Sequence, residues 1–568
     1  MLDNANFTFN GAAGLTWDHV QQGNDSSYLE DLRAVNWDAP GSLFAARYPD
    51  LARLRGDWPA GGAAACALDE DCGPSPARNV FATNVIVNAT ELFTPPPPPF
   101  ATTPFFNFSD NFQTAGDPGF VAGAQARAML DFQLRDDSPV YSVTGFQRIP
   151  MECFGPGKRC PGEPDWGSSQ RAMLRAVASA PARAPVPVPA DDYAWLLNTT
   201  RRMLLGCQIT GIGGVQLFTP DASSSYGAQW TRDFAMAVTG AGLSGAFGDA
   251  NVTAAVAYTL DRVTADGMAP DRVQADGKAV FAPGGPGSWP ILLAWDNMPY
   301  AALLLTAHER AWPSPGFFCR YEPVARRALD FVVLRDGLAY NDPAAPNCSF
   351  GFEDSVVMPG RMLTVSALTF SAAQEMAGLA GATGCGDAGH YAALAAAIAA
   401  RVGDLYDGAT RLFNASDGLE NVPDVFGSAL AATLGLASSE QAAGIADFLA
   451  EQWAASTATS TTTTTIWQEG QARHLPYPLL WKQCWGGGCP SPGTYQNGAF
   501  WATPLNWLLP AMAENGHAAE AAEVAAAAIS SFRASGVMEA INRDIGYTGV
   551  RDYVASATNL LGAVAPAS

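Results

Sequence analysis

Six short segments of the sequence carry polar side chains that donate and accept hydrogen bonds, and five of them also contain Trp, Phe or Tyr. They are residues 229–233 (QWTRD), 295–297 (WDN), 352–354 (FED), 421–424 (NVPD), 495–497 (YQN) and 547–552 (YTGVRD). Aromatic rings can lie against the apolar face of a pyranose, and Asp, Arg, Gln and Asn can bind the hydroxyls at its rim. Together the segments therefore predict a carbohydrate-binding site.

Each of the six segments precedes or begins a stretch with helical spacing. Beyond residue 190 the sequence predicts twelve helices. They fall near 191–206, 231–245, 250–264, 296–310, 321–335, 359–381, 386–405, 424–436, 439–454, 496–514, 517–534 and 552–563. Every second helix is apolar on nearly all sides, whereas several of the others carry charge on one face. This alternation predicts a mainly α fold, an (α/α)6 toroid of six inner and six outer helices, with the six segments at one mouth.

The polar residues at these helix starts have a second interpretation. Asp, Asn and Thr are common N-caps, and for Asp424 this structural role is at least as good an explanation as a functional one. Six such segments in the same register, most with an aromatic neighbour, favour a shared site over six independent caps.

From about residue 190 to 565 the sequence resembles the six-hairpin glycosidases, whose members include glucoamylase-like enzymes of family 15 and the trehalases and family 63 enzymes. The resemblance rests on four motifs: residues 230–233 (WTRD), 295–297 (WDN), 352–355 (FEDS) and 495–501 (YQNGAFW). The first and third are similar to glucoamylase motifs, although Phe352 replaces a Trp and Asp354 replaces a second Glu. The second is similar to the trehalase and family 63 side of the superfamily.

The resemblance implies a role for each of these positions. Glu353 would be the general acid and Glu539 the general base. Asp354 is an alternative acid, with Glu353 then binding a hydroxyl, and Asp296 is a third possibility. The substrate-binding residues would be Trp230, Arg232, Asp233, Trp295, Asp296, Asn297, Asp354, Tyr495, Gln496, Asn497 and Trp501.

Two carboxyls at opposite sides of a ring suit the inverting hydrolysis of a glycosidic bond. One carboxyl protonates the leaving oxygen, and the other, ~6.5 to 9.5 Å away, activates a water molecule. The expected function is hydrolysis of an α-linked glucoside or related glycan, and it requires no cofactor. Glu539 could instead be an ordinary loop carboxylate. A glycoside phosphorylase and a non-catalytic carbohydrate-binding protein are the alternative functions.

Cysteines and glycosylation sequons predict the compartment. Of the ten Cys, three pairs lie close in sequence, namely Cys66 with Cys72, Cys153 with Cys160 and Cys484 with Cys489, which favours disulfides over metal ligation. Asn-x-Ser/Thr sequons begin at Asn6, Asn24, Asn88, Asn107, Asn198, Asn251, Asn347 and Asn414. We expect a secreted or endomembrane-lumen glycoprotein, although residues 1–10 have no signal-peptide pattern.

The remaining features define domains and exclude partners. Residues 1–189 are rich in Pro and Gly and predict a β-rich domain with a linker, and residues 190–568 predict the catalytic domain. A net charge of −22 disfavours nucleic acid and anionic membranes as partners. No apolar run reaches the ~18 residues that a membrane span needs.

A long connection before the fifth segment has two interpretations. Residues 457–494 could cover the mouth as a lid. Their tryptophans Trp467, Trp481 and Trp485 could form outer sugar subsites, or they could simply pack inside the protein.

Overall fold

The computed structural model describes residues 79–82, 85–87, 106–109, 112–114, 135, 137–142, 185–248, 250–285, 289–458 and 464–567. The chain divides into two compact units, Met1–Pro164 and Asp165–Ser568. The predicted boundary at residue 189 thus differs from the division at residue 164. Val186–Val188, which the sequence analysis assigns to the linker, form strand β5 and pair in parallel with β21 (Val564–Pro566) of the second unit.

The described part of the first unit consists mainly of short strands. β1 (Asn79–Ala82) pairs in parallel with β3 (Phe106–Ser109), and β2 (Val85–Val87) pairs in parallel with β4 (Phe112–Thr114). These strands agree with the β-rich character expected of this region. Pro139–Ser142 instead form the 3-10 helix η4, because a proline ring fixes φ near the helical value.

The second unit contains twelve α-helices within the described residues. Their bounds are α6 Ala190–Gly206, α7 Thr231–Ala241, α8 Val252–Leu260, α9 Asn297–Ala311, α10 Pro315–Phe331, α11 Leu363–Thr383, α12 Ala388–Ala399, α13 Val425–Thr433, α14 Ser439–Ala458, α15 Leu505–Ala513, α16 Ala518–Ser535 and α17 Val554–Ala563. The twelve predicted helices are all present.

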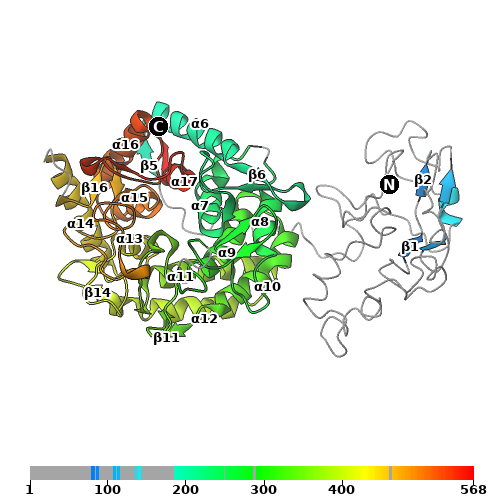
Figure 1. The fold of residues 1–568 in the computed structure, drawn as a ribbon, viewed down its shortest axis with the longest axis horizontal. Helices are drawn as coiled ribbons and strands as arrows, with labels where there is room; N and C mark the ends of the chain where they lie inside the picture. Colours follow the sequence, from blue (N-terminus) through cyan, green and yellow to red (C-terminus); the bar gives the residue numbers. More distant parts are fainter. Residues whose placement is uncertain are drawn as a thin grey trace, which may run out of the picture. The chain divides into compact units, whose positions relative to one another are not determined.

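The helices form a closed double ring (Figure 1). Each of the inner helices α7, α9, α11, α13, α15 and α17 packs against the next, and α17 packs against α7 to close the circle. The others lie outside them, for example α10 against α9 and α12 against α11. The fold is therefore an (α/α)6 toroid, as the alternation of apolar and amphipathic helices predicts.

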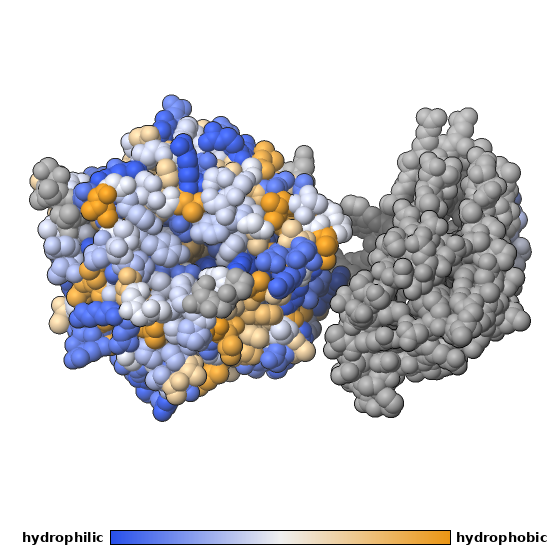
Figure 2. Space-filling model, in the orientation of Figure 1, coloured by the Kyte–Doolittle hydropathy of each residue, from blue (hydrophilic) through white to orange (hydrophobic). Residues whose placement is uncertain are grey.

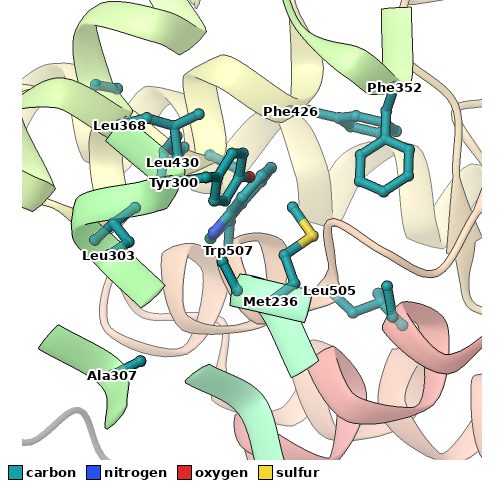
Figure 3. Close-up of a cluster of buried hydrophobic side chains, with 14 of the residues drawn as sticks. Met236, Tyr300, Leu303, Ala307, Phe352, Leu368, Phe426, Leu430, Leu505 and Trp507 are labelled. Carbon is teal, nitrogen blue, oxygen red and sulfur yellow. The ribbon is translucent and has the colours of Figure 1, made fainter. Parts of the chain in front are cut away.

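Small side chains let the ring close. A Cβ on Gly240 of α7 would overlap the backbone of Thr558 in α17, and Gly562 of α17 lies against Gly240 in turn. These two helices therefore approach at a distance that only glycine permits. The centre of the ring is filled rather than open, because side chains of α7, α9, α11, α13 and α15 meet there (Figure 3).

One helix begins later than its sequence predicts. α15 starts at Leu505, whereas the predicted helix starts at residue 496. Tyr495 has a φ of 43° that interrupts a helix. Phe500 and Trp501 form β18, the middle strand of a five-stranded sheet in the order β16 (Trp467–Gln468), β17 (Gln471–Ala472), β18, β19 and β20 (Tyr547–Thr548). In this sheet, β19 (Ala540–Asn542) follows Glu539 directly.

Two disulfides lie within the described residues. The predicted bond between Cys484 and Cys489 is present, and a bond between Cys319 and Cys385, which the spacing does not reveal, joins α10 to the end of α11. The other predicted pairs lie outside the described residues.

Figure 2 shows a face of the helical unit that is mostly hydrophilic, with hydrophobic residues in small, scattered patches. Among the described helices, none is long and apolar enough to cross a membrane.

Candidate active site

The segments that precede the inner helices are joined by side-chain hydrogen bonds at one end of the ring. Arg232 bonds to Asp296, Gln496 bonds to Asp354, and Tyr553 bonds to Asp233. These contacts span between 64 and 320 residues of sequence. The structure thus brings four of the six predicted segments, together with Tyr553 directly after the sixth, into one polar network.

Arg232 is the centre of this network. Its Nη1 donates to Asp296 Oδ2 at 3.1 Å, and its other nitrogens lie 3.9 Å from Asp233 and 3.7 Å from Asp271. Burial alone lowers the pKa of Arg232, but Asp296, Asp233 and Asp271 outweigh it and raise the pKa well above the usual value. The guanidinium also lies over the ring of Phe352, 5.1 Å from its centroid. A buried cation held by three carboxylates is a fixed support for the mouth.

Gly351 supplies the room for this cation. Its N–H donates to Asp296 Oδ2 at 3.0 Å, and a Cβ at this position would overlap the Arg232 guanidinium. We expect Gly351→Ala to displace Arg232 from its carboxylates and to lower the free energy of unfolding by about 3 kcal/mol or more. Urea denaturation measures this loss.

A matched control is available in α11. Gly378 has open space where its Cβ would be, so Gly378→Ala should leave stability unchanged or raise it slightly, since alanine is the better helix former. Equal stability of the Gly351→Ala protein and the wild type would contradict the close fit of Arg232 against Gly351.

Glu353 is almost fully buried, with an exposed fraction of 1%. It ends the short 3-10 helix η8 (Gly351–Glu353), and its Oε2 has no hydrogen-bond partner. Burial raises the pKa of Glu353 well above its usual range, and the carboxylates of Asp424 and Asp296 raise it further. These surroundings therefore favour the protonated form of Glu353, and its Oε2 has no internal hydrogen-bond donor that would stabilise a charge.

Asp354 differs from its neighbour because an amide donor faces it. Gln496 Oε1 accepts hydrogen bonds from the Ser355 N–H at 3.0 Å and the Ser355 hydroxyl at 2.6 Å, so its Nε2 points away and donates to Asp354 Oδ1 at 2.8 Å. Burial raises the pKa of Asp354 to about 7, while the bond from Gln496 acts in the opposite direction. Gln496 thus favours the ionised, accepting form of Asp354.

Glu539 has the environment of a base. Its Oε1 accepts from the Tyr226 hydroxyl at 3.2 Å, and its Oε2 lies 3.4 Å from the Val550 N–H. Burial raises the pKa of Glu539 to about 7, and these two donors act against that rise. The negative charges of Asp233 and Asp354 also raise this pKa, so Glu539 interacts electrostatically with both carboxylates.

Three residues of the network are not among those that the sequence predicts for the site. Tyr226 orients Glu539, Tyr553 donates to Asp233 at 2.5 Å, and Asp271 flanks Arg232. Tyr226 is itself held by Asp221, which is fully buried and accepts hydrogen bonds from the backbone of residues 223, 225 and 226. An Asp-Arg pair at 271–272 within an otherwise apolar stretch is the signal that could have identified Asp271.

Some predicted binding residues lie in the core instead. Trp501 is fully buried against Phe352, and Trp295 donates its indole N–H to Asn341. Asn297 is also fully buried. The Asn497 side chain accepts a hydrogen bond from the Trp481 N–H and donates one to the Pro490 carbonyl. These four side chains are buried, and those of Trp501, Trp295 and Asn497 contact other protein groups. Their assignment to sugar binding therefore stays a prediction.

Other predicted residues remain at the mouth. Trp230 and Tyr495 are partly exposed, as is Asp354, and the Arg272 guanidinium lies 5.2 Å from the Trp230 ring centroid. Asp424 is an N-cap, since its carboxylate accepts the Gly427 N–H at 2.8 Å, and the structural interpretation of this residue is confirmed.

The tryptophans of the long connection also pack inside the protein. Trp467 is fully buried, and Trp481 and Trp485 are at most 9% exposed. They therefore stabilise the connection and are not outer sugar subsites in this conformation.

Comparisons with known proteins place the fold in context. No protein-family model matches the chain, and no curated protein sequence matches it. Among solved structures it is similar to a family 63 mannosylglycerate hydrolase from Thermus thermophilus, with 16% identity and a TM-score of 0.45 over 65% of this chain and 99% of that one. It is also similar to a glucoamylase from Saccharomycopsis fibuligera, with 13% identity and a TM-score of 0.44 over 68% and 98% of the two chains.

Proposed function

We propose that this protein is an inverting glycoside hydrolase in which Glu353 is the general acid and Glu539 the general base. The observation that carries the proposal is the contrast between these two carboxyls in one polar mouth. Burial and neighbouring carboxylates favour the protonated form of Glu353, whose Oε2 has no hydrogen-bond partner, whereas Glu539 accepts hydrogen bonds from Tyr226 and Val550 and has a pKa of about 7. Two carboxyls whose environments separate their protonation states are suited to divide acid and base roles.

Glu539 would act on water. Its carboxylate is oriented by Tyr226 and the Val550 N–H, and each oxygen has a further lone pair for a water proton. As the water oxygen bonds to the anomeric carbon, Glu539 takes a proton from it and becomes neutral. At a pKa of about 7, a substantial fraction of Glu539 is ionised at neutral pH.

Glu353 would act on the leaving group. Its proton passes to the glycosidic oxygen as the bond from that oxygen to the anomeric carbon breaks, which leaves Glu353 ionised and the product with inverted configuration. Asp354 is the weaker candidate for this role because Gln496 donates to it. Asp354 would instead accept a sugar hydroxyl together with Asp233, while Trp230 would offer a ring face.

The charges of the site favour an uncharged substrate. The two buried arginines of the network are engaged, Arg232 with three carboxylates and Arg272 with Asp271 and the carbonyls of Ala282 and Gly284. A phosphorylase would need a cationic pocket where Glu539 lies, so hydrolysis is the better supported reaction. The motif resemblance suggests an exo-acting enzyme on an α-linked glucoside.

We also propose that the protein matures in the secretory route. Two disulfides within the described residues support this. The sequon residues Asn198 and Asn251 lie on the surface of the helical unit, where a glycan can be accommodated.

The test of the proposed function follows the anomeric configuration of the product. The protein is incubated with a panel of α- and β-linked oligosaccharides, with and without inorganic phosphate, and the first product is observed by NMR before it mutarotates. We expect a free sugar of inverted configuration, formed without phosphate. Retained configuration, a requirement for phosphate, or the absence of any product would each contradict the proposal.

A further inference from the structure

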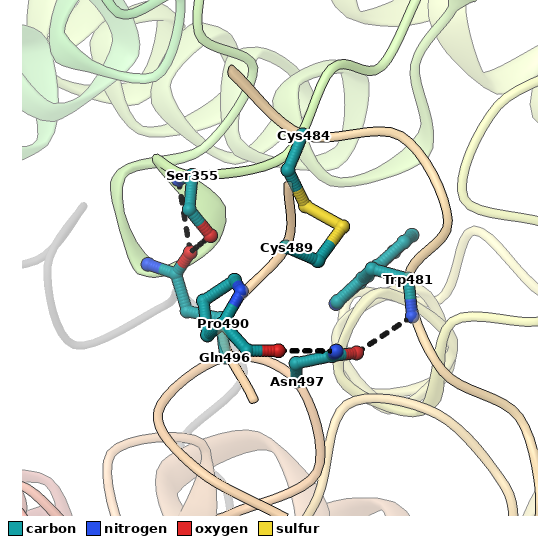
Figure 4. Close-up of a disulfide and its surroundings, with 7 residues drawn as sticks. All are labelled: Ser355, Trp481, Cys484, Cys489, Pro490, Gln496 and Asn497. Carbon is teal, nitrogen blue, oxygen red and sulfur yellow. Dashed lines mark hydrogen bonds between the residues drawn. A yellow bond between two sulfur atoms is a disulfide. The ribbon is translucent and has the colours of Figure 1, made fainter. Parts of the chain in front are cut away.

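We propose that the disulfide-closed loop 484–489, together with Gln496 and Asn497, is a brace that positions the segment bearing Glu353 and Asp354. The inference rests on the proposed function, and it assigns positioning roles to residues that lie outside the chemistry itself. Figure 4 shows the Cys484–Cys489 disulfide, Gln496 bonded to Ser355, and Asn497 bonded to Trp481 and Pro490.

Backbone hydrogen bonds join the loop to the carboxyl-bearing segment. The Trp485 N–H donates to the Ser355 carbonyl at 3.0 Å, and the Val357 N–H donates to the Gln483 carbonyl at 2.9 Å. Val356 pairs with Cys484 in an antiparallel bridge between these two bonds. The backbone directly after Asp354 is thus paired with the backbone at one end of the disulfide.

Apolar packing adds to this attachment. Val356 and Met358 lie in a buried cluster with Leu475 and Trp481, against which both Cys484 and Cys489 pack. The disulfide closes a loop of only five residues in sequence separation, which keeps Cys484 aligned with Val356.

Gln496 and Asn497 belong to the segment 495–497. They bind both the segment that bears Glu353 and Asp354 and the residues that flank loop 484–489. Gln496 binds the Ser355 N–H and hydroxyl on one side and Asp354 on the other. Asn497 accepts the Trp481 N–H at 2.8 Å and donates to the Pro490 carbonyl at 2.7 Å, and so holds the loop at both of its ends.

A brace is needed because the acid lies on short irregular structure. Glu353 ends a 3-10 turn of three residues, and α11 does not begin until Leu363. A displacement of about 1 Å in a catalytic group can cost 10²-fold in rate. The contacts of residues 355–357 with the loop restrain the part of this segment that directly follows Asp354, whereas Met358 and residues 360–361 are held by residues 340–341.

The experiment compares two disulfides. In the test variant, Cys484→Ser and Cys489→Ser are combined. In the control, Cys319→Ser and Cys385→Ser remove the other bond, which lies beyond the C-terminal end of α11, about 30 Å from its start at the mouth. Rates are measured on substrates with good and poor leaving groups, together with hydrogen–deuterium exchange of the peptide 351–358.

We expect the test variant to lose about 10- to 100-fold in kcat on poor leaving groups and much less on good ones, with little change in KM, because a displaced acid matters only when the leaving oxygen needs a proton. Exchange in 351–358 should become about tenfold faster. The control should lose thermal stability while its leaving-group dependence and its exchange in this peptide match the wild type.

Unchanged kcat and unchanged exchange in the test variant, or the same changes in the control, would overturn the brace. If the test variant fails to fold, Asn497→Ala removes two bonds of the brace and leaves both disulfides intact, and the same two readouts apply. If the wild type cleaves no glycoside, the proposed function fails, and the exchange result still decides whether loop 484–489 restrains residues 351–358.

Discussion

Replacing Glu539 by Gln is expected to reduce glycoside hydrolysis by about 10²- to 10⁴-fold, with equal loss on every substrate. The amide keeps the shape of the side chain but cannot take a proton from water. The loss should not depend on the leaving group, because the attacking water needs its base whichever bond breaks. Initial rates on substrates with fluoride, dinitrophenol and sugar leaving groups measure this.

The pH profile of the wild type provides a second measure of the same residue. Glu539 must be ionised to act, and its pKa is raised to about 7. We therefore expect kcat/KM to fall tenfold for each pH unit below about 7 and to level off above it. Glu375→Gln is a suitable control, because this carboxylate of α11 binds Arg310 and Thr306 of α9, and its replacement should leave activity unchanged. A Glu539→Gln protein with wild-type rates would rule out Glu539 as the base.

Replacing Glu353 by Gln is expected to have a comparable effect, about 10²- to 10⁴-fold, but only on poor leaving groups. Fluoride and dinitrophenolate leave without protonation, so on these substrates the variant should approach the wild-type rate. Asp354→Asn is the matched comparison, because it removes the adjacent carboxylate and leaves the acid. If Asp354→Asn shows the dependence on leaving group and Glu353→Gln does not, the acid is Asp354.

Glu353→Gln also has an expected effect on stability that requires no substrate. The pKa of Glu353 is raised in the folded protein, so folding takes up a proton at pH values between the ordinary pKa of a glutamate and this raised pKa. Each pH unit above that value costs the folded wild type about 1.4 kcal/mol, until the raised pKa is reached. We expect the variant to be more stable than the wild type at pH 7 and equally stable at pH 4. A variant that is less stable at pH 7 would show that Glu353 is not held protonated.

Local sequence predicted the helical ring well. Every second helix, such as the one containing Leu363–Thr383, is apolar on nearly all sides, and only a helix surrounded by others can bury such a surface. The N-cap interpretation of Asp424 is also a local property, because the carboxylate binds a backbone N–H three residues later. Such features depend on neighbours within a few residues, which the sequence lists directly.

The roles of single side chains at the mouth were less predictable. Trp501 and Asn497 belong to a motif that suggests sugar binding, yet one is enclosed in the core and the other holds the loop at Trp481. Tyr226 and Glu539 are 313 residues apart, and no local pattern connects them. Their contact depends on the way α17 returns to α7 and closes the circle.

The sequence by itself thus determined the toroid, the end of the ring at which the polar segments gather, and the disulfide between Cys484 and Cys489. Only the tertiary structure decided which of those polar groups contact one another and how the pKa of each carboxyl is shifted. The physical reason is that helix formation depends on apolar periodicity along the chain, whereas the pKa of a carboxyl depends on burial and on charges brought near it from distant segments. Glu353 and Asp354 are neighbours in sequence, and their different surroundings come from Asp424 on one side and Gln496 on the other.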